Sequence, residues 1–547
     1  MKLFITSSLP YVNSTPHLGN LIGSTLSGDV LARYKRSRGF EVIYLCGTDE
    51  YGSATTIKAR QENISCQDIC DKYHVIHKKI YDWFNIKFDI WGRTSTKSQT
   101  MITHEIFSEL YKNGYIDEKI LAQMYCIHCK LFLADRYVKG ECYNSECLGK
   151  NNISNGDQCD FCQSIIDVNK LINPFCSLCN KTPVLTDTKH LFLKLDSLSS
   201  NVINYLETGA NFKPSILSIT KNWLSKGLTP RCITRDLEWG TPVPIIGPAL
   251  CPYALKVFYV WFDAPFGYYS ILAENMPNWK AWLCDPKLEW ISTQAKDNVP
   301  FHTIFFPASI LGSKLNYPLI NQICGTDYLL FEGKKFSKSN SIGLFGDQVM
   351  EISKKLDINE DYWRFYLIKI RPETQDSSFN LKEFVSVINA DLASNIGNFV
   401  NRCVALTKNH SSCKSVSLYD DVKLGHYVKD YVSFMDNFKF RDALNTCLEL
   451  SDYGNQCLQT SSPWSVARSN ITEAQNSISK INIICWVLLN LLAPFIPGSV
   501  ERIFQCFKSN AVFDHLSFGF MVDISLGDNF VLPFQKIKYD DLINALA

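Results

Sequence analysis

The chain has 547 residues, 46% of them hydrophobic, and its 55 basic residues almost balance its 54 acidic residues. This length favours three or four domains, each able to bury a core. The balanced charge excludes a global positive field, so any nucleic acid must be met by local basic patches.

The sequence predicts a cytoplasmic protein. Residues 1–10 lack the basic segment and long apolar stretch of a signal peptide. The longest apolar run, residues 483–496, is interrupted by Asn490 and Pro494 and falls short of the roughly 20 residues that a membrane helix needs. The 21 cysteines are an odd number, and eight of them cluster. That usage fits metal thiolates in a reducing compartment better than a disulfide framework.

Residues 1–115 have the pattern of an α/β domain. Short apolar segments at 3–6 and 42–46 predict strands, and residues 20–36 between them have the apolar spacing of a helix. A strand, a polar loop and a helix in this order form one unit of a parallel nucleotide-binding sheet. We therefore expect the first half of a catalytic domain here.

The following segment, residues 116–230, is expected to be an insert, because paired cysteines, Gly, Asn and Asp dominate residues 120–185. Strand-like segments then return, and helical periodicity follows. The expected strands are 190–195, 257–262, 302–306 and 328–331, and the expected helices are 381–409, 427–437, 440–458 and 473–493. The predicted fold is therefore α/β, a Rossmann-like parallel sheet split by a zinc-binding insert and followed by an all-α bundle. The expected domains are the two catalytic halves 1–115 and 231–345, the insert 116–230, a connecting region 346–385 and the helical domain 386–547.

Two loops carry residues that suit a nucleotide. His17-Leu18-Gly19-Asn20 lies between the first strand and the first helix, where backbone N–H groups and the helix dipole favour anions. Gly19 permits close approach to the backbone, and His17 can donate a hydrogen bond to a phosphate oxygen. The second loop, residues 334–339, brings three lysines after a predicted strand, which suits a clamp on a polyphosphate. Taken alone, each pattern is more often found in an ordinary surface loop than in a nucleotide site.

Four cysteine pairs predict metal binding from their spacing alone. The eight thiols are Cys126-x2-Cys129, Cys142-x4-Cys147, Cys159-x2-Cys162 and Cys176-x2-Cys179. Tetrahedral Zn²⁺ takes four soft ligands, and a C-x2-C pair supplies two of them. We therefore predict two zinc sites, which should be structural because four thiolates leave no open coordination position.

In this order on one split sheet, the two loops resemble the HIGH and KMSKS signatures of class I aminoacyl-tRNA synthetases, here HLGN at 17–20 and KFSKS at 335–339. The surrounding motifs narrow the resemblance to the methionyl-tRNA synthetase family of the eukaryotic and archaeal type. They are SLPYVN at 8–13, CGTDEYG at 46–52, RDLEWG at 235–240, YVWFDAP at 259–265 and KDNVPFH at 296–302. The resemblance extends from about residue 3 to about residue 500.

The resemblance implies a role for each motif. The methionine slot would be formed by Leu9, Tyr11, Asp49, Trp261, Ala264, Pro265, Tyr268 and His302. Asp49 would hold the α-ammonium group, and the aromatic rings suit a thioether through sulfur–π contact. The ATP site would be formed by His17, Gly19, Asn20, Asp297, Lys335 and Lys338, and the catalytic residues would be His17, Asn20, Lys335 and Lys338. Asn20 replaces the last histidine of the signature, which excludes a charged role there, and Phe336 replaces Met and is expected only to pack.

The implied reaction has two steps. L-methionine and ATP, with Mg²⁺, give methionyl-adenylate and pyrophosphate, and the methionyl group then passes to the terminal ribose of tRNA(Met). No covalent enzyme intermediate is needed, so catalysis is positioning plus charge stabilisation. A monomer that contacts no membrane is expected.

The resemblance also groups the cysteines and assigns the helical domain. Cys126, Cys129, Cys176 and Cys179 would hold one zinc ion, and Cys142, Cys147, Cys159 and Cys162 the other, with the x4 spacing making the second site looser. Residues 346–385 would be a stem-contact region and 386–547 an anticodon-binding bundle. Trp464 would stack on an anticodon base, although a tryptophan packed between helices is the alternative.

Three alternatives are open. They are a cysteinyl or leucyl synthetase of the same class, a nucleotidyltransferase for a small molecule, and a non-catalytic RNA-binding scaffold derived from a synthetase. The aromatic slot favours methionine, and the helical bundle argues against a small-molecule transferase. A scaffold predicts decay of the nucleotide loops, whereas His17, Gly19, Asp49, Lys335 and Lys338 are all present.

Overall fold

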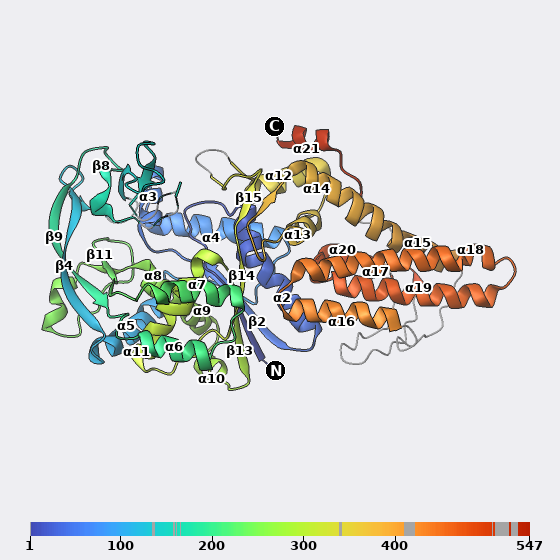
Figure 1. Cartoon of the computed structure of the whole chain (residues 1–547), viewed down its shortest axis with the longest axis horizontal. Coiled ribbons are helices and arrows are strands. Elements are labelled where there is room, and N and C mark those ends of the chain that lie inside the picture. Colours follow the sequence, from blue (N-terminus) through green and yellow to red (C-terminus); the bar gives the residue numbers. More distant parts are fainter. Residues whose placement is uncertain are drawn as a thin grey trace.

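The computed structural model describes residues 2–133, 137–156, 159, 161–162, 164, 166–337, 342–409, 422–505, 507–508, 525–526 and 534–546. The molecule is elongated in Figure 1, with a strand-rich part on the left and a bundle of helices extending to the right. Helices α2 (Leu26–Ser37) and α13 (Glu360–Lys369) lie where these two parts meet.

A five-stranded parallel sheet forms the centre of the strand-rich part, in the order β14-β13-β1-β2-β3. The strands are β1 Lys2–Ser7, β2 Glu41–Thr48, β3 Ile90–Arg93, β13 Leu288–Ala295 and β14 Gln322–Thr326. Leu3 and Ile5 pack on the α2 side, and Phe4 packs on the opposite side, in the cluster that also contains Phe107 of α5 (Lys97–Lys112). Both faces are buried, as a parallel sheet requires. The predicted strands at 3–6 and 42–46 are confirmed.

The insert between β3 and β13 begins as a long antiparallel ribbon. β4 (Ile116–Cys126) pairs with β9 (Val184–Leu193) along the full length of β9. A small sheet in the order β7-β6-β8 lies between them in sequence, formed by Ile153–Asn155, Val138–Glu141 and Ile172–Cys176. This sheet and the ends of the ribbon carry the clustered cysteines.

Two of the predicted strands are wrong. β12 covers only Val257–Phe258 and is followed by helix α8 (Val260–Asp263), and residues 302–306 lie in a helical segment, η7 (Phe301–Phe305), that continues into α11 (Phe306–Ser313). A short, fully apolar run has the same pattern in a buried strand and in a buried helix. Its length and composition therefore could not decide between them.

The helical domain is a bundle of long helices. α14 (Leu381–Val387), η8 (Ile388–Gly397) and α15 (Asn398–Asn409) follow one another directly, and α16 (Val422–Asp436), α17 (Phe440–Ser461) and α19 (Ile471–Leu492) pack beside them (Figure 1). These segments confirm the four predicted helices. The short helix α18 (Pro463–Val466) lies at the far end of the bundle (Figure 1). Within the described ranges, no helix has the length and apolarity to cross a bilayer.

A buried arginine joins the helical bundle to the strand-rich part of the molecule. Arg364 of α13 is 0% exposed and donates to Asp29 Oδ2 of α2 at 2.7 Å. The same guanidinium donates to the carbonyl oxygens of Phe84 at 3.0 Å and Phe495 at 2.9 Å. Because Asp29 and Phe84 belong to the strand-rich part and Phe495 to the turn after α19, the contact fixes the two parts against each other.

Candidate active site

The predicted site lies where the sheet changes direction. From β1 the chain continues to β2 and β3 on one side, whereas β13 leads to β14 on the other. In open α/β sheets, ligands bind in the crevice beyond the carboxyl ends of such a pair of strands. The loops after β1, β2 and β13 bring residues 8–17, 49–52 and 296–302 to this edge.

A small cavity at this edge is lined by all eight residues that were predicted for the methionine slot. Its volume is about 60 Å³, and its walls are Leu9, Tyr11, Asp49, Trp261, Ala264, Pro265, Tyr268 and His302, with Ser8, Asn298 and Phe301. The lining comes from four separate segments of the chain. A concave, mostly apolar slot with a few polar groups is the usual form of a small-ligand site.

Asp49 supplies the ionisable carboxyl of this slot. Its backbone N–H donates to the Pro10 carbonyl at 2.9 Å, and the residue is 4% exposed. Its Oδ1 has no hydrogen-bond partner within the described part of the chain. Burial, helped by the nearby Asp263 and Glu50 carboxyls, raises the pKa of Asp49 well above its usual range. A buried carboxyl with a free oxygen suits a cationic group of a ligand, which would favour its ionised form.

Glu50, the next residue, has hydrogen-bond partners for both carboxylate oxygens, and these bonds fix the end of the strand that carries Asp49. The Arg93 Nε–H donates to Glu50 Oε1 at 3.0 Å and to Oε2 at 2.9 Å, and Thr48 Oγ1 donates to Oε1 at 2.8 Å. Trp239 Nε1 donates to the Glu50 carbonyl at 2.7 Å. The two adjacent carboxyls therefore differ in role, since Glu50 is paired with Arg93, whereas Asp49 accepts a backbone hydrogen bond from Tyr51 and keeps Oδ1 without a partner among the described residues.

The far wall of the slot is electrically neutral. His302 Nδ1 donates to the Asn298 carbonyl at 2.9 Å, so its Nε2 accepts from the Tyr268 hydroxyl at 2.9 Å. Burial lowers the pKa of His302 to about 4. An uncharged wall of rings suits a polarizable thioether.

Phe301 is a slot residue that the sequence reasoning missed. Its ring centroid lies 3.7 Å from that of Trp261, and both rings line the slot. Asn298, Phe301 and His302 have helical spacing, which places them on one face of a helix. This helical spacing is visible in the sequence. The predicted strand at 302–306 hides it, because alternation along a strand does not place these three side chains together.

The HLGN and KFSKS loops meet each other. The His17 and Phe336 rings are stacked, with centroids 4.3 Å apart and planes inclined by 5°. Phe336 therefore packs as expected, and its partner is the first residue of the other signature. A Cβ on Gly19 would lie 3.0 Å from the His17 ring, so glycine leaves room for this stack.

His17 is held as a neutral hydrogen-bond donor. Its Nδ1 accepts from the Asn20 backbone N–H at 3.2 Å, and Asn20 Oδ1 accepts from the His17 backbone N–H at 3.1 Å. Burial lowers the pKa of His17 to about 4. Because Nδ1 is an acceptor, the ring proton lies on Nε2, where it can be donated to an anion.

The other predicted nucleotide residues lie beside these loops. Lys335 Nζ is 5.5 Å from the centroid of the Tyr328 ring, and its charge acts on Asp297. Burial raises the pKa of Asp297, and Lys296 and Lys335 partly offset this effect. Lys338 lies outside the described residues.

The eight clustered cysteines form the two groups of four that were predicted. Cys126, Cys129, Cys176 and Cys179 form one group, and Cys142, Cys147, Cys159 and Cys162 form the other. Sulfur–sulfur distances are 3.5 Å for Cys126–Cys179 and 3.9 Å for Cys129–Cys176 in the first group, and 3.8 Å for both Cys142–Cys162 and Cys147–Cys159 in the second. Four sulfurs at about 2.3 Å from a tetrahedral Zn²⁺ would be about 3.8 Å apart. Both groups therefore fit a metal, including the one with the x4 spacing.

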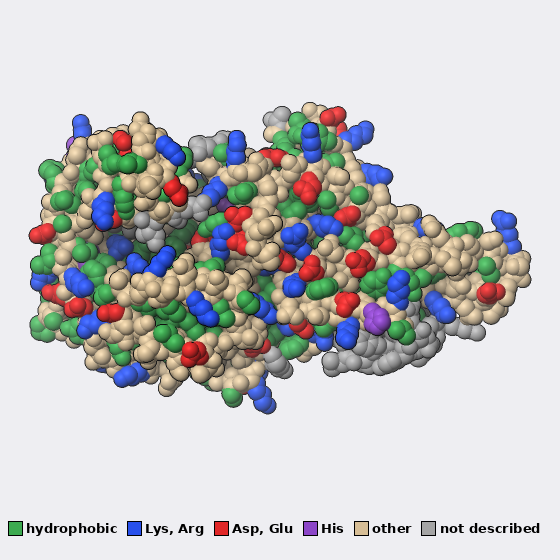
Figure 2. Space-filling view, viewed as in Figure 1, with side chains coloured by type: hydrophobic (Ala, Val, Ile, Leu, Met, Phe, Trp, Pro, Cys, Tyr) green, Lys and Arg blue, Asp and Glu red, His purple; other side chains and the backbone are tan. Residues whose placement is uncertain are grey.

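Trp464 lies on α18 at the far end of the bundle (Figure 1). It is 45% exposed, and the Arg402 guanidinium lies 5.7 Å from its ring centroid. A tryptophan buried between helices would not leave this much of the side chain in solvent. On the face shown in Figure 2, acidic and basic side chains are interspersed over the bundle, in agreement with the balanced composition.

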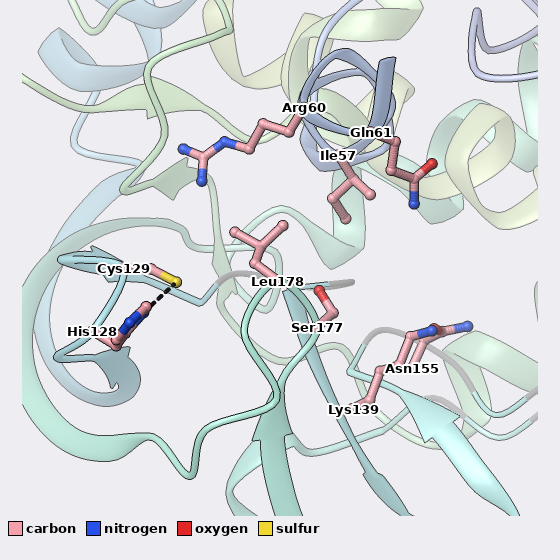
Figure 3. Close-up of a pocket in the computed structure, with 9 residues that line it drawn as sticks. All are labelled: Ile57, Arg60, Gln61, His128, Cys129, Lys139, Asn155, Ser177 and Leu178. Atoms are coloured by element: carbon pink, nitrogen blue, oxygen red, sulfur yellow. Dashed lines mark hydrogen bonds between the residues drawn. The ribbon is translucent and has the colours of Figure 1, made fainter. Parts of the chain in front are cut away.

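A second cavity lies between α3 (Ser53–Glu62) and the first cysteine group (Figure 3). It has a volume of about 650 Å³ and is lined by Ile57, Arg60, Gln61, His128, Cys129, Lys139, Asn155, Ser177 and Leu178. Although it is larger than the slot, none of the predicted methionine or ATP residues lines it. Arg60, Lys139 and His128 give this cavity a local basic lining. A balanced net charge permits such local patches, although it excludes a global positive field.

Comparisons with known proteins agree with this geometry. A family model described as class I tRNA synthetases (M) matches residues 3–404, and one described as the anticodon binding domain of methionyl tRNA ligase matches residues 411–544. A methionine–tRNA ligase of Acanthamoeba polyphaga mimivirus is 54% identical over 544 residues, which are 99% of this chain and 98% of that protein. The cytoplasmic methionine–tRNA ligase of Homo sapiens is 43% identical over 510 residues, 91% of this chain and 55% of that protein.

A solved structure of Mycobacterium tuberculosis methionyl-tRNA synthetase in complex with methionyl-adenylate has the same fold. Its TM-score is 0.71 at 19% identity, and the match covers 92% of this chain and 94% of that one. The split parallel sheet, the two meeting signature loops and the helical domain thus define a class I aminoacyl-tRNA synthetase. Within that class, the chain belongs to the methionyl-tRNA synthetase family, and the cysteinyl and leucyl alternatives are set aside.

Proposed function

We propose that this chain activates L-methionine with ATP and transfers it to the 3′ end of tRNA(Met). The observation that carries the proposal is the slot itself. Its apolar walls end at Asp49, whose buried carboxyl has an oxygen with no partner among the described residues. An amino acid with an unbranched apolar side chain and an α-ammonium group matches both parts.

In the first step, Asp49 holds the α-ammonium group, and the wall of Trp261, Tyr268 and His302 takes the thioether. The methionine carboxylate attacks the α-phosphorus of ATP, the bond to the bridging oxygen breaks, and pyrophosphate leaves. The Nε2–H of His17 donates a hydrogen bond to a phosphate oxygen, and Lys335 stabilises the charge that moves onto pyrophosphate. Gly19, Asn20, Asp297 and Lys338 complete the ATP site in this proposal. The geometry supports it because His17 and Phe336 hold the two signature loops together.

In the second step, the terminal ribose hydroxyl of tRNA attacks the carbonyl carbon of methionyl-adenylate, and AMP leaves. Recognition of the anticodon falls to the bundle, with Trp464 stacking on a base. The exposure of Trp464 at the far end of the bundle supports this role.

We assign both cysteine groups to Zn²⁺, because four thiolates at tetrahedral spacing are its preferred structural site. The sites would stabilise the insert, and no step of the reaction passes through them. Mg²⁺ is expected to accompany ATP as its counter-ion. A cytoplasmic monomer fits the reducing compartment that the free cysteines need and the relatives that are named cytoplasmic.

Amino-acid-dependent exchange of pyrophosphate into ATP tests the proposal. Each of the twenty amino acids is supplied in turn to the full-length chain with ATP, Mg²⁺ and labelled pyrophosphate. Methionine alone should support exchange. Exchange with another amino acid would move the chain elsewhere in the class, and no exchange would favour the non-catalytic scaffold.

A further inference from the structure

The edge where the insert meets the catalytic sheet carries a thiol, an imidazole and a carboxylate that the proposed reaction does not use. β10 (Arg231–Cys232) pairs antiparallel with β9, and Cys232 lies opposite Phe192. Thr234 follows Cys232 by two residues, and His190 precedes Phe192 by two residues; the Leu191 backbone N–H donates to Thr234 Oγ1 at 3.0 Å. Because side chains alternate between the faces of a strand, Cys232, Thr234 and His190 lie on the same face.

His190 is the centre of this cluster and is 0% exposed. Its Nδ1 lies 2.9 Å from Thr234 Oγ1. Its Nε2 lies 3.1 Å from Asp236 Oδ2, in an ion pair without hydrogen-bond geometry. Burial by itself would lower the pKa of His190, but Asp236 and Cys232 together raise it above its usual value. The ring is therefore disposed to carry a positive charge.

The carboxylate beside the imidazole is fixed from its other side. Lys256 Nζ donates to Asp236 Oδ1, and it also donates to Thr188 Oγ1 at 2.7 Å. The charged groups that act on the thiol are His190 and, on the next strand, β11 (Thr234–Arg235), Arg235; Asp236 and Lys256 act on His190. The protonated thiol donates to the Thr234 carbonyl at 3.4 Å. For Cys232, burial acts against ionisation, yet His190 and Arg235 bring the pKa of the thiol below its usual value.

The cysteine can be reached from a cavity of about 430 Å³. Cys232, Arg231 and Arg235 line it, and Trp261 and Phe301 separate it from the methionine slot. This volume is in the range of small-molecule sites. The lining contains Arg231 and Arg235 against one carboxylate, Asp167, and this excess of positive charge favours an anionic ligand. A thiolate in an accessible, electropositive environment is the nucleophilic form of cysteine.

We propose that Cys232 is a reactive thiolate that exchanges with small anionic disulfides and forms a mixed disulfide inside this cavity. The Cys232 sulfur attacks one sulfur of the disulfide, a new S–S bond forms, the old one breaks, and the released thiolate takes a proton from water. An excess of the free thiol reverses the exchange. The assignment does not depend on the ligase activity.

The pH dependence of alkylation tests the proposal on the zinc-loaded, full-length protein. The folded chain is treated briefly with iodoacetamide between pH 5.5 and 9.5, and each cysteine peptide is quantified by mass spectrometry. The midpoint of the Cys232 rate should lie below the value of about 8.5 at which an unperturbed thiol titrates. A midpoint at or above that value, or no labelling of Cys232 in the folded protein, overturns the proposal.

A variant identifies the cause of the shift. His190→Gln should lower the Cys232 rate at pH 7 by about tenfold for each unit that the midpoint rises. His426→Gln, an exposed histidine on α16, is the matched control and should change nothing. An unchanged pH dependence of Cys232 alkylation in His190→Gln overturns the role of the imidazole. If that variant does not fold, the pH dependence of the wild-type protein tests the proposal by itself.

The disulfide step is measured separately at pH 7. Glutathione disulfide should add one glutathionyl group to the Cys232 peptide, and dithiothreitol should remove it. Addition at the exposed Cys251 or Cys284 without addition at Cys232 overturns the proposal. Because this assay measures the mass of the Cys232 peptide, its result does not depend on whether the chain catalyses pyrophosphate exchange.

Discussion

Replacing Asp49 with Asn separates charge from shape in the methionine slot. The amide keeps the volume of the side chain and removes the carboxylate that we assign to the α-ammonium group. Removing one partner of a buried charge pair costs about 2–5 kcal/mol. The kcat/KM for methionine in pyrophosphate exchange should therefore fall roughly 30- to 5,000-fold.

The same substitution should stabilise the ligand-free protein. Folding raises the pKa of Asp49, so the unfolded chain ionises this carboxyl at a lower pH than the folded chain does. As the pH rises above the unfolded value of about 3.9, ionisation favours unfolding, until the pH passes the folded pKa. The amide escapes this penalty. The Tm of Asp49→Asn should exceed that of the wild type at pH 7.5, and the difference should shrink at pH 4.

Exchange kinetics and thermal unfolding by circular dichroism, on the same preparations, measure both effects. Glu50→Gln is the matched comparison, one residue away. It removes one of the two carboxylates that pair with the partly buried Arg93, the other being Asp71, and should lower stability by on the order of 3 kcal/mol. An Asp49→Asn protein with wild-type kcat/KM, or with a lower Tm at pH 7.5, would refute the reasoning.

Four further predictions follow from the charges and contacts of the site and the bundle. Lys338→Ala should slow adenylate formation far more than it weakens methionine binding, and single-turnover kinetics with an unchanged rate would exclude the clamp role. Trp464→Ala should leave exchange intact and raise the KM for tRNA roughly 5- to 150-fold; an equal loss in both assays would make it a folding residue. Replacing Cys142 and Cys147 with Ser should reduce zinc from two ions per chain to one in atomic emission, and two remaining ions would show that these thiols are not ligands. Arg364→Met should lower the unfolding free energy in urea by about 3–5 kcal/mol, because it leaves Asp29 buried with one partner fewer. An unchanged urea midpoint would show that the Arg364 contacts do not stabilise the two parts against each other.

The slot and the cysteine groups could be predicted from the sequence because each contribution lies in a short motif. Leu9 and Tyr11 are two residues apart, and Ala264, Pro265 and Tyr268 lie within one helical turn of each other. Local spacing fixes which side chains share a face. The family resemblance then supplied which motifs meet, and the cavity lining agrees with it.

Long-range pairing could not be read in the same way. β13 is a central strand, yet its Ser292, Thr293 and Gln294 are polar and fully buried, so its sequence does not show the apolar run expected of a buried parallel strand. The Thr293 hydroxyl is satisfied by Ser7 of β1 at 2.8 Å, a partner that no local pattern reveals. The stack of His17 on Phe336 and the placement of Cys232 beside His190 are likewise products of strand order and register.

The pairing of β1 with β13, which lie far apart in the sequence, affects how the protein folds during its synthesis. Ser7 and Thr293 are 286 residues apart in the chain. At about 5–20 residues per second, a ribosome needs roughly 15–60 s to synthesise the segment between them. During that interval β1 can pair with β2 but not with β13, and an open strand edge is a template for pairing with other chains. The nascent amino-terminal region therefore carries an uncovered edge until the insert has been synthesised and β13 emerges.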